Sequence, residues 1–240
     1  MNKVSVCFSP ALYPFYAQKD EIVIIIDIFR ATTSICAAFN NGARSVRTVA
    51  TTEEAIRLKS EGYPVAAEQN TQRCEFADFG NSPFDFTAEK VNNRDLVFTT
   101  TNGTQAVEAA LGAEEILIGS FSNHGALLRY CLNAKKDMLL LCSGWKNRFC
   151  IEDTLFAGRF ADELIHAGSF VSDNDAVKAA RDFWKVAKSD FINYICDTEH
   201  YQRLKKNGLE NEIEYCLAED TTSVVPVYDK TIKAFINQRN

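Results

Sequence analysis

One pattern of hydrophobic and polar positions recurs along most of the chain: a short apolar run, a few polar residues, and then a helical pattern. The first clear case runs from Glu21 to Ile26, where β-branched residues predict a buried strand that ends at Asp27. A helical pattern follows across Thr32 to Asn40 and stops at Asn41-Gly42, because asparagine and glycine favour helix ends. The unit therefore predicts a strand followed by a helix that covers it.

The same unit repeats as far as about residue 167. It predicts further strands at Ser45 to Ala50, Pro64 to Ala67, Leu96 to Thr99, Glu115 to Ile118 and Met138 to Cys142. It also predicts four helices that follow strands. They run from Thr52 to about Ser60, from just after Thr104 to Leu111, from just after Asn123 to Asn133, and from about Glu152 to Ala167. Thr71 to Phe86 is expected to be a loop. The alternation predicts an α/β fold, with a mainly parallel or mixed sheet covered by helices on both faces.

The C-terminal part of the chain has a different pattern. Helices are expected from Ser172 to about Lys206 and from Glu210 to Ala218, and a last strand at Ser223 to Tyr228. Pro226 favours an edge position for that strand, because proline cannot donate to a ladder. We expect one α/β domain over residues 1–240, or two intimately packed lobes with a more helical part from about residue 168.

Composition and charge exclude several classes of protein. The 240 residues are 46% hydrophobic and 24% charged, as is typical of globular proteins. A net charge of −6 argues against a non-specific nucleic-acid binder, which would show a basic footprint. The longest apolar runs have five residues, whereas a membrane-spanning helix needs about 20. Because a signal peptide pattern is also missing, we expect a cytoplasmic protein that contacts neither nucleic acid nor membrane.

Cysteine and histidine spacing gives no metal motif. No two of the eight cysteines lie three residues apart, so a Cys-x-x-Cys zinc or redox motif is missing. Most cysteines have apolar neighbours, which is typical of reduced core thiols in a cytosolic protein. The three histidines are far apart and form no His-x-x-x-His pair. The spacing therefore argues against a histidine-based zinc hydrolase.

Candidate catalytic residues stand where predicted strands end. In open α/β sheets, ligands bind beyond the carboxyl ends of the strands, where Asp27 and Glu68 fall. Asp27 has the side chain to hold a divalent metal or to attack a phosphoryl group, and the alternative is a helix N-cap or a salt bridge. Arg30 carries a fork suited to a phosphate or sulfonate, and the alternative is an ion pair with Asp27 or another carboxylate.

Two loops add anion-binding and metal-binding candidates. Thr100, Thr101, Asn102, Gly103 and Thr104 precede a helix, where hydroxyls and backbone amides can cradle an anion or simply cap the helix. Their spacing is neither a Walker A loop nor a dinucleotide fingerprint. Glu152 and Asp153 begin another helix, where either both favour its dipole or one of them binds a metal together with Asp27. Lys146 and Arg148 lie close by and can offset an anionic substrate.

These motifs together resemble the 2-phosphosulfolactate phosphatase family. The resemblance rests on segments in the family's order, which together cover about residues 22 to 228. They are Ile24 to Ile35, Phe79-Gly80-Asn81-Ser82-Pro83, Thr100 to Thr104, Cys142-Ser143-Gly144, Arg148 to Gly158, Glu214-Tyr215-Cys216-Leu217 and Val224-Val225-Pro226. Two places depart from the family's pattern. Ala67-Glu68-Gln69 stands where the family tends to carry an arginine, and Trp145 and Lys146 add bulk after Ser143-Gly144.

The resemblance implies a Mg²⁺-dependent enzyme that hydrolyses 2-phospho-3-sulfolactate to 3-sulfolactate and phosphate, a step toward coenzyme M. It also implies a small anionic phosphorylated substrate and a homo-oligomer, which we expect to be a homodimer. On this hypothesis Asp27 holds the metal with one or both of Glu152 and Asp153, and Glu68 is a further candidate beside them. Arg30 and the Thr100 to Thr104 backbone bind the phosphate. The remaining groups are positioned by Asn81, Ser82, Asn123, Ser143 and Gly144, with Lys146 or Arg148 near the sulfonate.

Two chemical routes and two other functions stay open at this point. Either a metal-activated water attacks the phosphorus, or Asp27 forms an aspartyl-phosphate. The Asp-x-Asp pattern of haloacid-dehalogenase-type phosphatases is missing, since position 29 is Phe29, and this disfavours the covalent route. The other functions are a phosphatase for another small phosphorylated hydroxy acid, and a non-catalytic binding protein for a phosphorylated or sulfonated metabolite.

Overall fold

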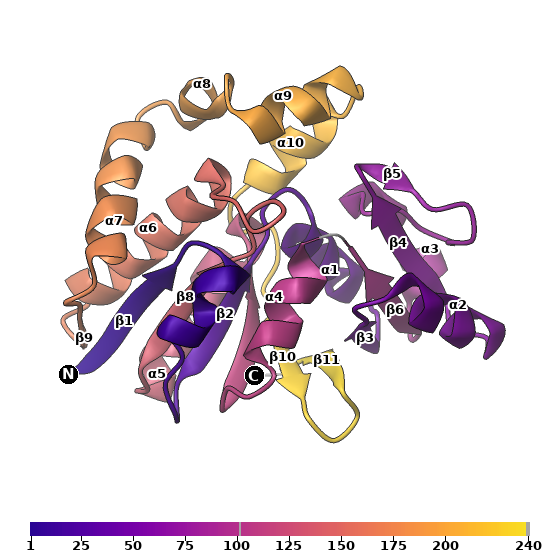
Figure 1. The fold of residues 1–240 in the computed structure, drawn as a ribbon, viewed down its shortest axis with the longest axis horizontal. Helices are drawn as coiled ribbons and strands as arrows, with labels where there is room; N and C mark the ends of the chain where they lie inside the picture. The colour runs from indigo at the N-terminus through magenta and orange to yellow at the C-terminus, as the bar shows by residue number, and fades with distance from the viewer. Residues whose placement is uncertain (101, 239–240) are drawn as a thin grey trace.

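A single mixed sheet runs through the protein. The computed structural model describes residues 1–100 and 102–238. Within these residues the sheet has eleven strands in the order β5-β4-β6-β3-β11-β10-β7-β2-β8-β1-β9 (Figure 1). Its strands are β1 (Asn2–Cys7), β2 (Ile22–Ile26), β3 (Ser45–Thr48), β4 (Val65–Gln69), β5 (Gln72–Arg73), β6 (Asp95–Thr99), β7 (Glu115–Gly119), β8 (Met138–Cys142), β9 (Phe170–Val171), β10 (Pro226–Asp229) and β11 (Ala234–Asn237).

Helices cover both faces of this sheet. They are α1 (Ala31–Asn40), α2 (Thr52–Ser60), α3 (Ala88–Val91), α4 (Gly103–Ala110), α5 (His124–Ala134), α6 (Ile151–His166), α7 (Asp175–Ala187), α8 (Phe191–Ile195), α9 (Glu199–Lys206) and α10 (Glu210–Leu217). The described residues also form three short 3₁₀ helices, η1 (Pro10–Phe15), η2 (Pro83–Asp85) and η3 (Phe121–Asn123). The predicted α/β fold with a mixed, helix-covered sheet is confirmed.

Strand β2 shows why both faces are apolar. It lies between β7 and β8, parallel to both, with Ile24 beside Leu117 and Leu140. Ile24 belongs to a core cluster shared with α5, α6 and α7, whereas Ile25 belongs to a cluster shared with α1 and α4. Because successive side chains of a strand point to opposite faces, a strand covered on both sides must be apolar throughout.

Helices α6 and α7 pack closely against one another. A Cβ placed on Gly158 of α6 would lie 2.1 Å from the carbonyl oxygen of Ala180 in α7, which is far inside van der Waals contact. Figure 1 shows the two helices side by side, followed by α8, α9 and α10 along one end of the sheet. Gly158 therefore lets α7 approach, and the chain then continues across the strand ends.

The structure corrects three local predictions. Helix α7 begins at Asp175 and not at Ser172, because the side chain of Asn174 caps it by accepting from the backbone N–H of Val177 at 3.0 Å. The expected Thr71 to Phe86 loop contains β5 and η2, and β4 extends to Gln69. The predicted last strand is followed by β11, and β10 lies between β7 and β11 instead of at the edge. Pro226 is tolerated there because it is the first residue of β10.

The described helices include none with the length and apolarity needed to cross a bilayer. The predicted homodimer and cytoplasmic location stay predictions.

His124, at the start of α5, makes stability depend on pH. Its ring is buried against Phe156 and Phe160, and its Nε2 has no hydrogen-bond partner within the described residues. Burial, followed by the charge of Arg159, lowers the pKa of His124 to about 4, against the opposing charge of Asp220. Neutral His124 is therefore favoured in the folded state. The contribution of neutral His124 to the unfolding free energy is present above pH 6.5, which is the pKa of histidine in the unfolded chain. This contribution is lost as the pH falls toward 4.

We expect His124→Gln to flatten this acid sensitivity. Between pH 7.0 and 4.5 the wild-type protein should lose about 2 kcal/mol more unfolding free energy than the variant, as the pKa shift implies by linkage. Urea unfolding at the two pH values measures the difference. His166→Gln is the matched control, since His166 is exposed. Equal losses in wild type and His124→Gln would contradict the assignment.

Candidate functional site

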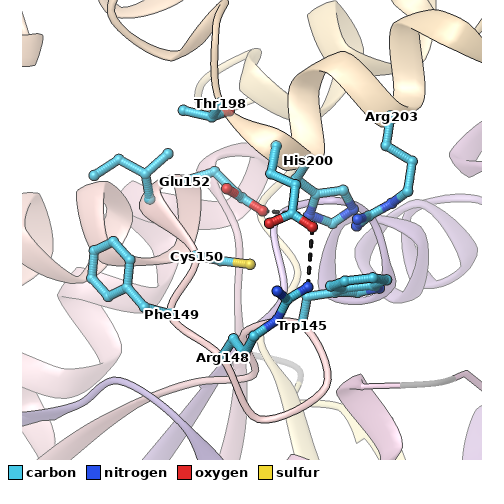
Figure 2. A pocket seen from close by; sticks show the side chains of 10 residues that line it. Trp145, Arg148, Phe149, Cys150, Glu152, Thr198, His200 and Arg203 are labelled. Atoms are coloured by element: carbon cyan, nitrogen blue, oxygen red, sulfur yellow. Dashed lines mark hydrogen bonds and ion pairs between the residues drawn. The ribbon is translucent and has the colours of Figure 1, made fainter.

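The carboxyl ends of β2, β4, β6 and β8 meet under α9 and form two joined pockets. The larger, about 420 Å³, lies between the start of α6 and the start of α9 (Figure 2). The narrower one reaches the strand ends and is lined by Asp27, Phe29, Arg30, Glu68, Asn70, Thr71, Asn81, Thr100 and Asn102. Trp145, His200 and Arg203 line both pockets. The expected edge of the sheet therefore carries a concave site whose narrower part is mostly polar.

Asp27 lies in the narrow pocket directly after β2. Thr32 holds its backbone, because the Thr32 hydroxyl donates to the Asp27 carbonyl oxygen at 2.8 Å and accepts from the Asp27 N–H at 3.1 Å. The buried side chain accepts one long hydrogen bond, from the N–H of Ala31 at 3.3 Å. Burial raises the pKa of Asp27 to about 6, with His200 opposing the rise and Glu152 and Glu68 adding to it. Asp27 therefore changes charge near neutral pH.

The loop before α4 packs against this carboxylate. A Cβ placed on Gly103 would lie 2.8 Å from the Cβ of Ala31 and 3.0 Å from Oδ2 of Asp27, so glycine permits the contact. The buried Oγ1 of Thr100 has no partner within the described residues and lines the narrow pocket. Asn102 also lines this pocket, and its side-chain oxygen accepts from the backbone N–H of Lys146 at 2.9 Å. Predicted residue Thr101 lies outside the described residues.

Glu152 faces the pocket from the first turn of α6 and pairs with His200. Nδ1 of His200 lies 2.6 Å from Oε1 of Glu152. Burial would raise the pKa of Glu152, but the charge and hydrogen bond of His200 outweigh burial and hold that pKa below its usual value. The second oxygen, Oε2, is buried and has no hydrogen-bond partner within the described part of the chain. An unpartnered carboxylate oxygen beside a pocket is available to a cation or a proton donor.

Asp153 joins two strand ends. Its Oδ1 accepts from the N–H of Ile28 at 2.9 Å, and its Oδ2 accepts from the N–H of Gly144 at 3.0 Å. The loops after β2 and β8 are thereby tied to the start of α6. Burial, together with the charges of Glu152 and Asp27, raises the pKa of Asp153 well above its usual value. These contacts make Asp153 a positioning residue, and its role as a metal ligand stays a prediction.

Arg30 and Glu68 line the pocket but also have protein partners. The guanidinium of Arg30 forms a buried ion pair with Glu212, and it donates to the carbonyl oxygen of Thr71 at 3.4 Å. The structure thus realises the ion-pair alternative for Arg30, with a carboxylate other than Asp27. Glu68 accepts from the N–H of Thr71, and from the side-chain amide of Asn81 at 3.4 Å. Both residues therefore also hold the wall of the pocket in shape.

Other predicted residues lie beside the pocket or away from it. Arg148 lines the larger pocket and pairs with Glu199 at 3.0 Å. Eight of the predicted residues that the structure describes line neither of the two pockets. They are Ser82, Gly103, Thr104, Asn123, Ser143, Gly144, Lys146 and Asp153. The fully buried Asn123 donates to the carbonyl oxygens of Ile118 and Val224, each at 3.1 Å. The structure therefore does not bring Asn123 to the site, because its amide anchors the C-terminal segment.

Sequence reasoning missed Arg203 and His200 as site residues. Both come from α9, three residues apart, so they share one face of the helix. The guanidinium carbon of Arg203 lies 4.1 Å from the ring centroid of Trp145 (Figure 2). Its Nε and Nη2 are buried without a hydrogen-bond partner within the described residues. The three-residue spacing was the available signal, but only the fold shows that this face closes the pocket.

A comparison with known protein families places the chain. The family model described as 2-phosphosulpholactate phosphatase matches residues 7–231. The chain belongs to this family. The resemblance noted from its motifs is confirmed, and so is the expectation of a phosphoric monoester hydrolase at the level of the family.

Curated relatives agree with this membership over most of their length. A Thermotoga maritima protein is 37% identical over 203 residues, which is 85% of this chain and 87% of the relative. A Caldanaerobacter subterraneus protein is 35% identical over 212 residues, 87% of this chain and 88% of the relative. A Clostridium botulinum protein is 30% identical over 231 residues, 95% of this chain and 97% of the relative. All three carry the name "Probable 2-phosphosulfolactate phosphatase".

Proposed function

We propose that this chain is a Mg²⁺-dependent phosphatase that hydrolyses 2-phospho-3-sulfolactate to 3-sulfolactate and phosphate. Family membership supports the reaction class. The single observation that carries the proposal is the joined pocket, where the buried carboxylates of Asp27 and Glu152 lie near the guanidinium of Arg203, whose Nε and Nη2 have no hydrogen-bond partner within the described residues. A site that pairs carboxylates with a free cation suits a reaction in which a metal and an anionic ester meet.

The donor set of the pocket fits magnesium. Mg²⁺ prefers oxygen ligands, binds few protein carboxylates and keeps several waters. Asp27 and Glu152 supply such oxygens, and Oε2 of Glu152 has no hydrogen-bond partner within the described residues. These two residues would hold the ion, with Glu68 lining the same pocket as Asp27. When bound, magnesium supplies positive charge that offsets the charge of the phosphoryl oxygens.

The chain's own side chains provide the rest of the anion site. Nε and Nη2 of Arg203, which have no hydrogen-bond partner within the described residues, can donate to oxygens of a phosphate or sulfonate. The ring of Trp145 lies 4.1 Å from the guanidinium carbon and helps to hold the planar group in place. The Thr100 hydroxyl, which has no hydrogen-bond partner among the residues that the structure describes, is a further polar group in the pocket wall. Arg203 also supplies an arginine to the pocket that Glu68 lines, and the segment around Glu68 lacks the arginine that the family tends to carry there. The larger pocket gives the sulfonate arm room beside Arg148.

Asp27 can take either of two roles at the reacting phosphorus. As a base it accepts the proton of the attacking water, and as a nucleophile it forms an aspartyl-phosphate that water then hydrolyses. Both roles need the ionised carboxylate, and a bound cation favours that form of Asp27. Rapid acid quenching during turnover, followed by a search for phosphorylated Asp27, separates the two routes.

Phosphate release tests the proposal directly. The purified protein is given 2-phospho-3-sulfolactate and a panel of small phosphate esters, each with Mg²⁺ and with EDTA. We expect release that EDTA suppresses and that is fastest with 2-phospho-3-sulfolactate. EDTA-sensitive release from another phosphorylated hydroxy acid alone would keep the chemistry and overturn the substrate. Binding of these anions with no release from any of them would instead favour a non-catalytic binding protein.

A further inference from the structure

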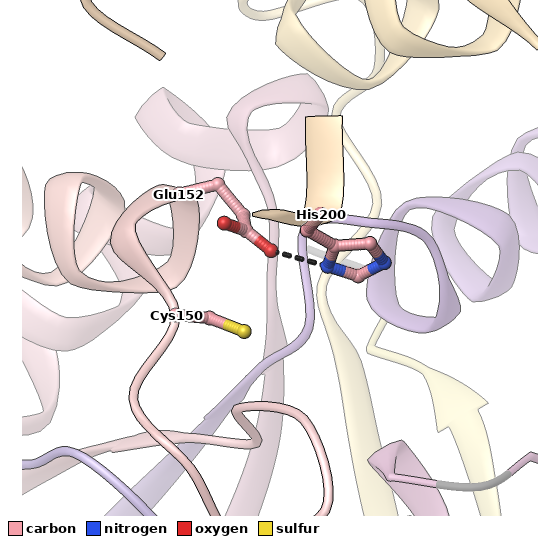
Figure 3. Close-up of side chains that lie close together, drawn as sticks. All are labelled: Cys150, Glu152 and His200. Atoms are coloured by element: carbon pink, nitrogen blue, oxygen red, sulfur yellow. Dashed lines mark hydrogen bonds and ion pairs between the residues drawn. The ribbon is translucent and has the colours of Figure 1, made fainter. Parts of the chain in front are cut away.

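A cysteine, a glutamate and a histidine converge at the wall of the larger pocket. Sγ of Cys150, a carboxylate oxygen of Glu152 and a ring nitrogen of His200 all lie within 4.8 Å of one another (Figure 3). All three residues are buried, with exposed fractions of 7%, 1% and 8%. The thiol is free, since none of the cysteines in the described residues forms a disulfide. We propose that these three side chains form a binding site for a thiophilic divalent transition-metal ion such as Zn²⁺.

The chemistry of the three donors selects this class of ion. Sulfur, imidazole nitrogen and carboxylate oxygen are the ligands that Zn²⁺ takes in proteins, at bonds of about 2.0–2.3 Å. Such bonds place the ligand atoms roughly 3–4 Å apart, so small side-chain rotations suffice from the observed arrangement. Mg²⁺ prefers oxygen ligands, so it gains little from a thiol and an imidazole. The set therefore differs in kind from the Asp27 and Glu152 pair.

The backbone around the cluster is suited to hold an ion. Cys150 is the N-cap residue of α6, Glu152 lies in its first turn, and His200 lies in the first turn of α9. Oε2 of Glu152 is buried and unpartnered within the described residues, which is a second sign that this carboxylate is available to a ligand. All three residues line the larger pocket, which provides a path for entry and leaves a fourth coordination position open.

Binding changes the proton balance of the cluster. The Cys150 thiol must lose its proton to bind the ion. If His200 and Glu152 both bind the ion directly, the ion also displaces the proton of the hydrogen bond between them. These protons go to solvent, so affinity should rise with pH. Glu152 belongs to both donor sets, so an ion at this cluster competes with Mg²⁺ for that carboxylate. Metal binding here does not depend on the proposed phosphatase activity.

Cobalt provides a spectroscopic test. Co²⁺ is titrated into metal-free protein, and a bound thiolate reports itself through sulfur-to-cobalt charge-transfer absorption. We expect one Co²⁺ per chain with this absorption, and loss of the signal when Zn²⁺ is added. Cys150→Ser should abolish the absorption and weaken Zn²⁺ binding by at least about tenfold. Cys196→Ser, a matched change outside both pockets, should leave both unchanged.

A second variant covers the case in which Cys150→Ser does not fold. His200→Asn should keep the charge-transfer absorption at high Co²⁺ concentration but weaken binding by at least about tenfold, because one of three ligands is lost. Wild-type protein that shows no charge-transfer absorption would overturn the proposal. The proposal would also be overturned by an absorption that survives in folded Cys150→Ser or that disappears in Cys196→Ser. Wild-type affinity of His200→Asn for Co²⁺ would overturn it as well.

Discussion

Replacing Asp27 with asparagine should lower phosphate release from 2-phospho-3-sulfolactate by at least about 10³-fold, whichever chemical route operates. The amide keeps the shape of the side chain, but it can neither accept a proton, attack phosphorus, nor supply negative charge to a metal. Steady-state phosphate release in saturating Mg²⁺ measures the loss in kcat. Turnover at the wild-type rate would overturn both the metal assignment and the catalytic role of Asp27.

The same variant should be more stable than the wild type in the absence of metal. The pKa of Asp27 is about 6 in the folded protein and 3.8 in its reference state, so ionisation of Asp27 costs folding free energy above pH 6. Asparagine cannot ionise and avoids this cost. We expect an increase of about 1–3 kcal/mol in unfolding free energy at pH 7.5 in EDTA, which shrinks as the pH falls toward 4.

Urea unfolding at both pH values checks this, with Asp20→Asn as the matched control. Asp20 is exposed and has φ of 65°, a conformation that asparagine also adopts readily. The control should change neither turnover nor stability beyond about 0.5 kcal/mol. A stable but inactive Asp27→Asn protein would show that the fold tolerates an unfavourable buried charge at this position because the site uses it.

Replacing Arg203 with glutamine should lower kcat/KM for 2-phospho-3-sulfolactate by about 10² to 10³-fold. Nε and Nη2 of Arg203 lie in the pocket wall without a hydrogen-bond partner in the described part of the chain, and removal of one preorganised charged donor has an effect of this size. Burial lowers the pKa of this guanidinium and outweighs the opposing charges of nearby acidic groups, so its charge disfavours the folded protein in the absence of an anion. Unfolding free energy should therefore stay the same or rise.

Two further variants define what Arg203 contributes. Arg203→Lys keeps the charge but loses the planar fork that lies on Trp145, so its kcat/KM should fall between wild type and Arg203→Gln. Arg57→Gln is the control, since Arg57 forms an exposed ion pair with Glu61, and such pairs contribute little to stability. Initial rates across a substrate series measure each kcat/KM. A wild-type value for Arg203→Gln would remove Arg203 from the anion site.

Much of the fold follows from local pattern, and particular elements show why. Strand β8 has the predicted bounds, Met138–Cys142, because an uninterrupted apolar run is stable only inside a sheet covered on both faces. Helix α2 likewise has the predicted start, because Thr51 caps it by accepting from the N–H of Glu54. The place of β10 was not predictable in this way. Its antiparallel pairing with β7 depends on a segment more than a hundred residues away.

In the candidate site, too, some features follow from local sequence pattern and others follow only from the tertiary structure. The sequence by itself determined that Asp27 follows a buried strand and that Glu152 opens a helix, because strand and helix ends are set by local patterning. Only the tertiary structure decided that Arg30 pairs with Glu212, that Asp153 ties two strand ends, and that α9 carries His200 and Arg203 over them. These contacts join residues between 9 and 182 positions apart, most of them more than a hundred. Local periodicity carries no information about such pairs, because packing of whole elements brings them together.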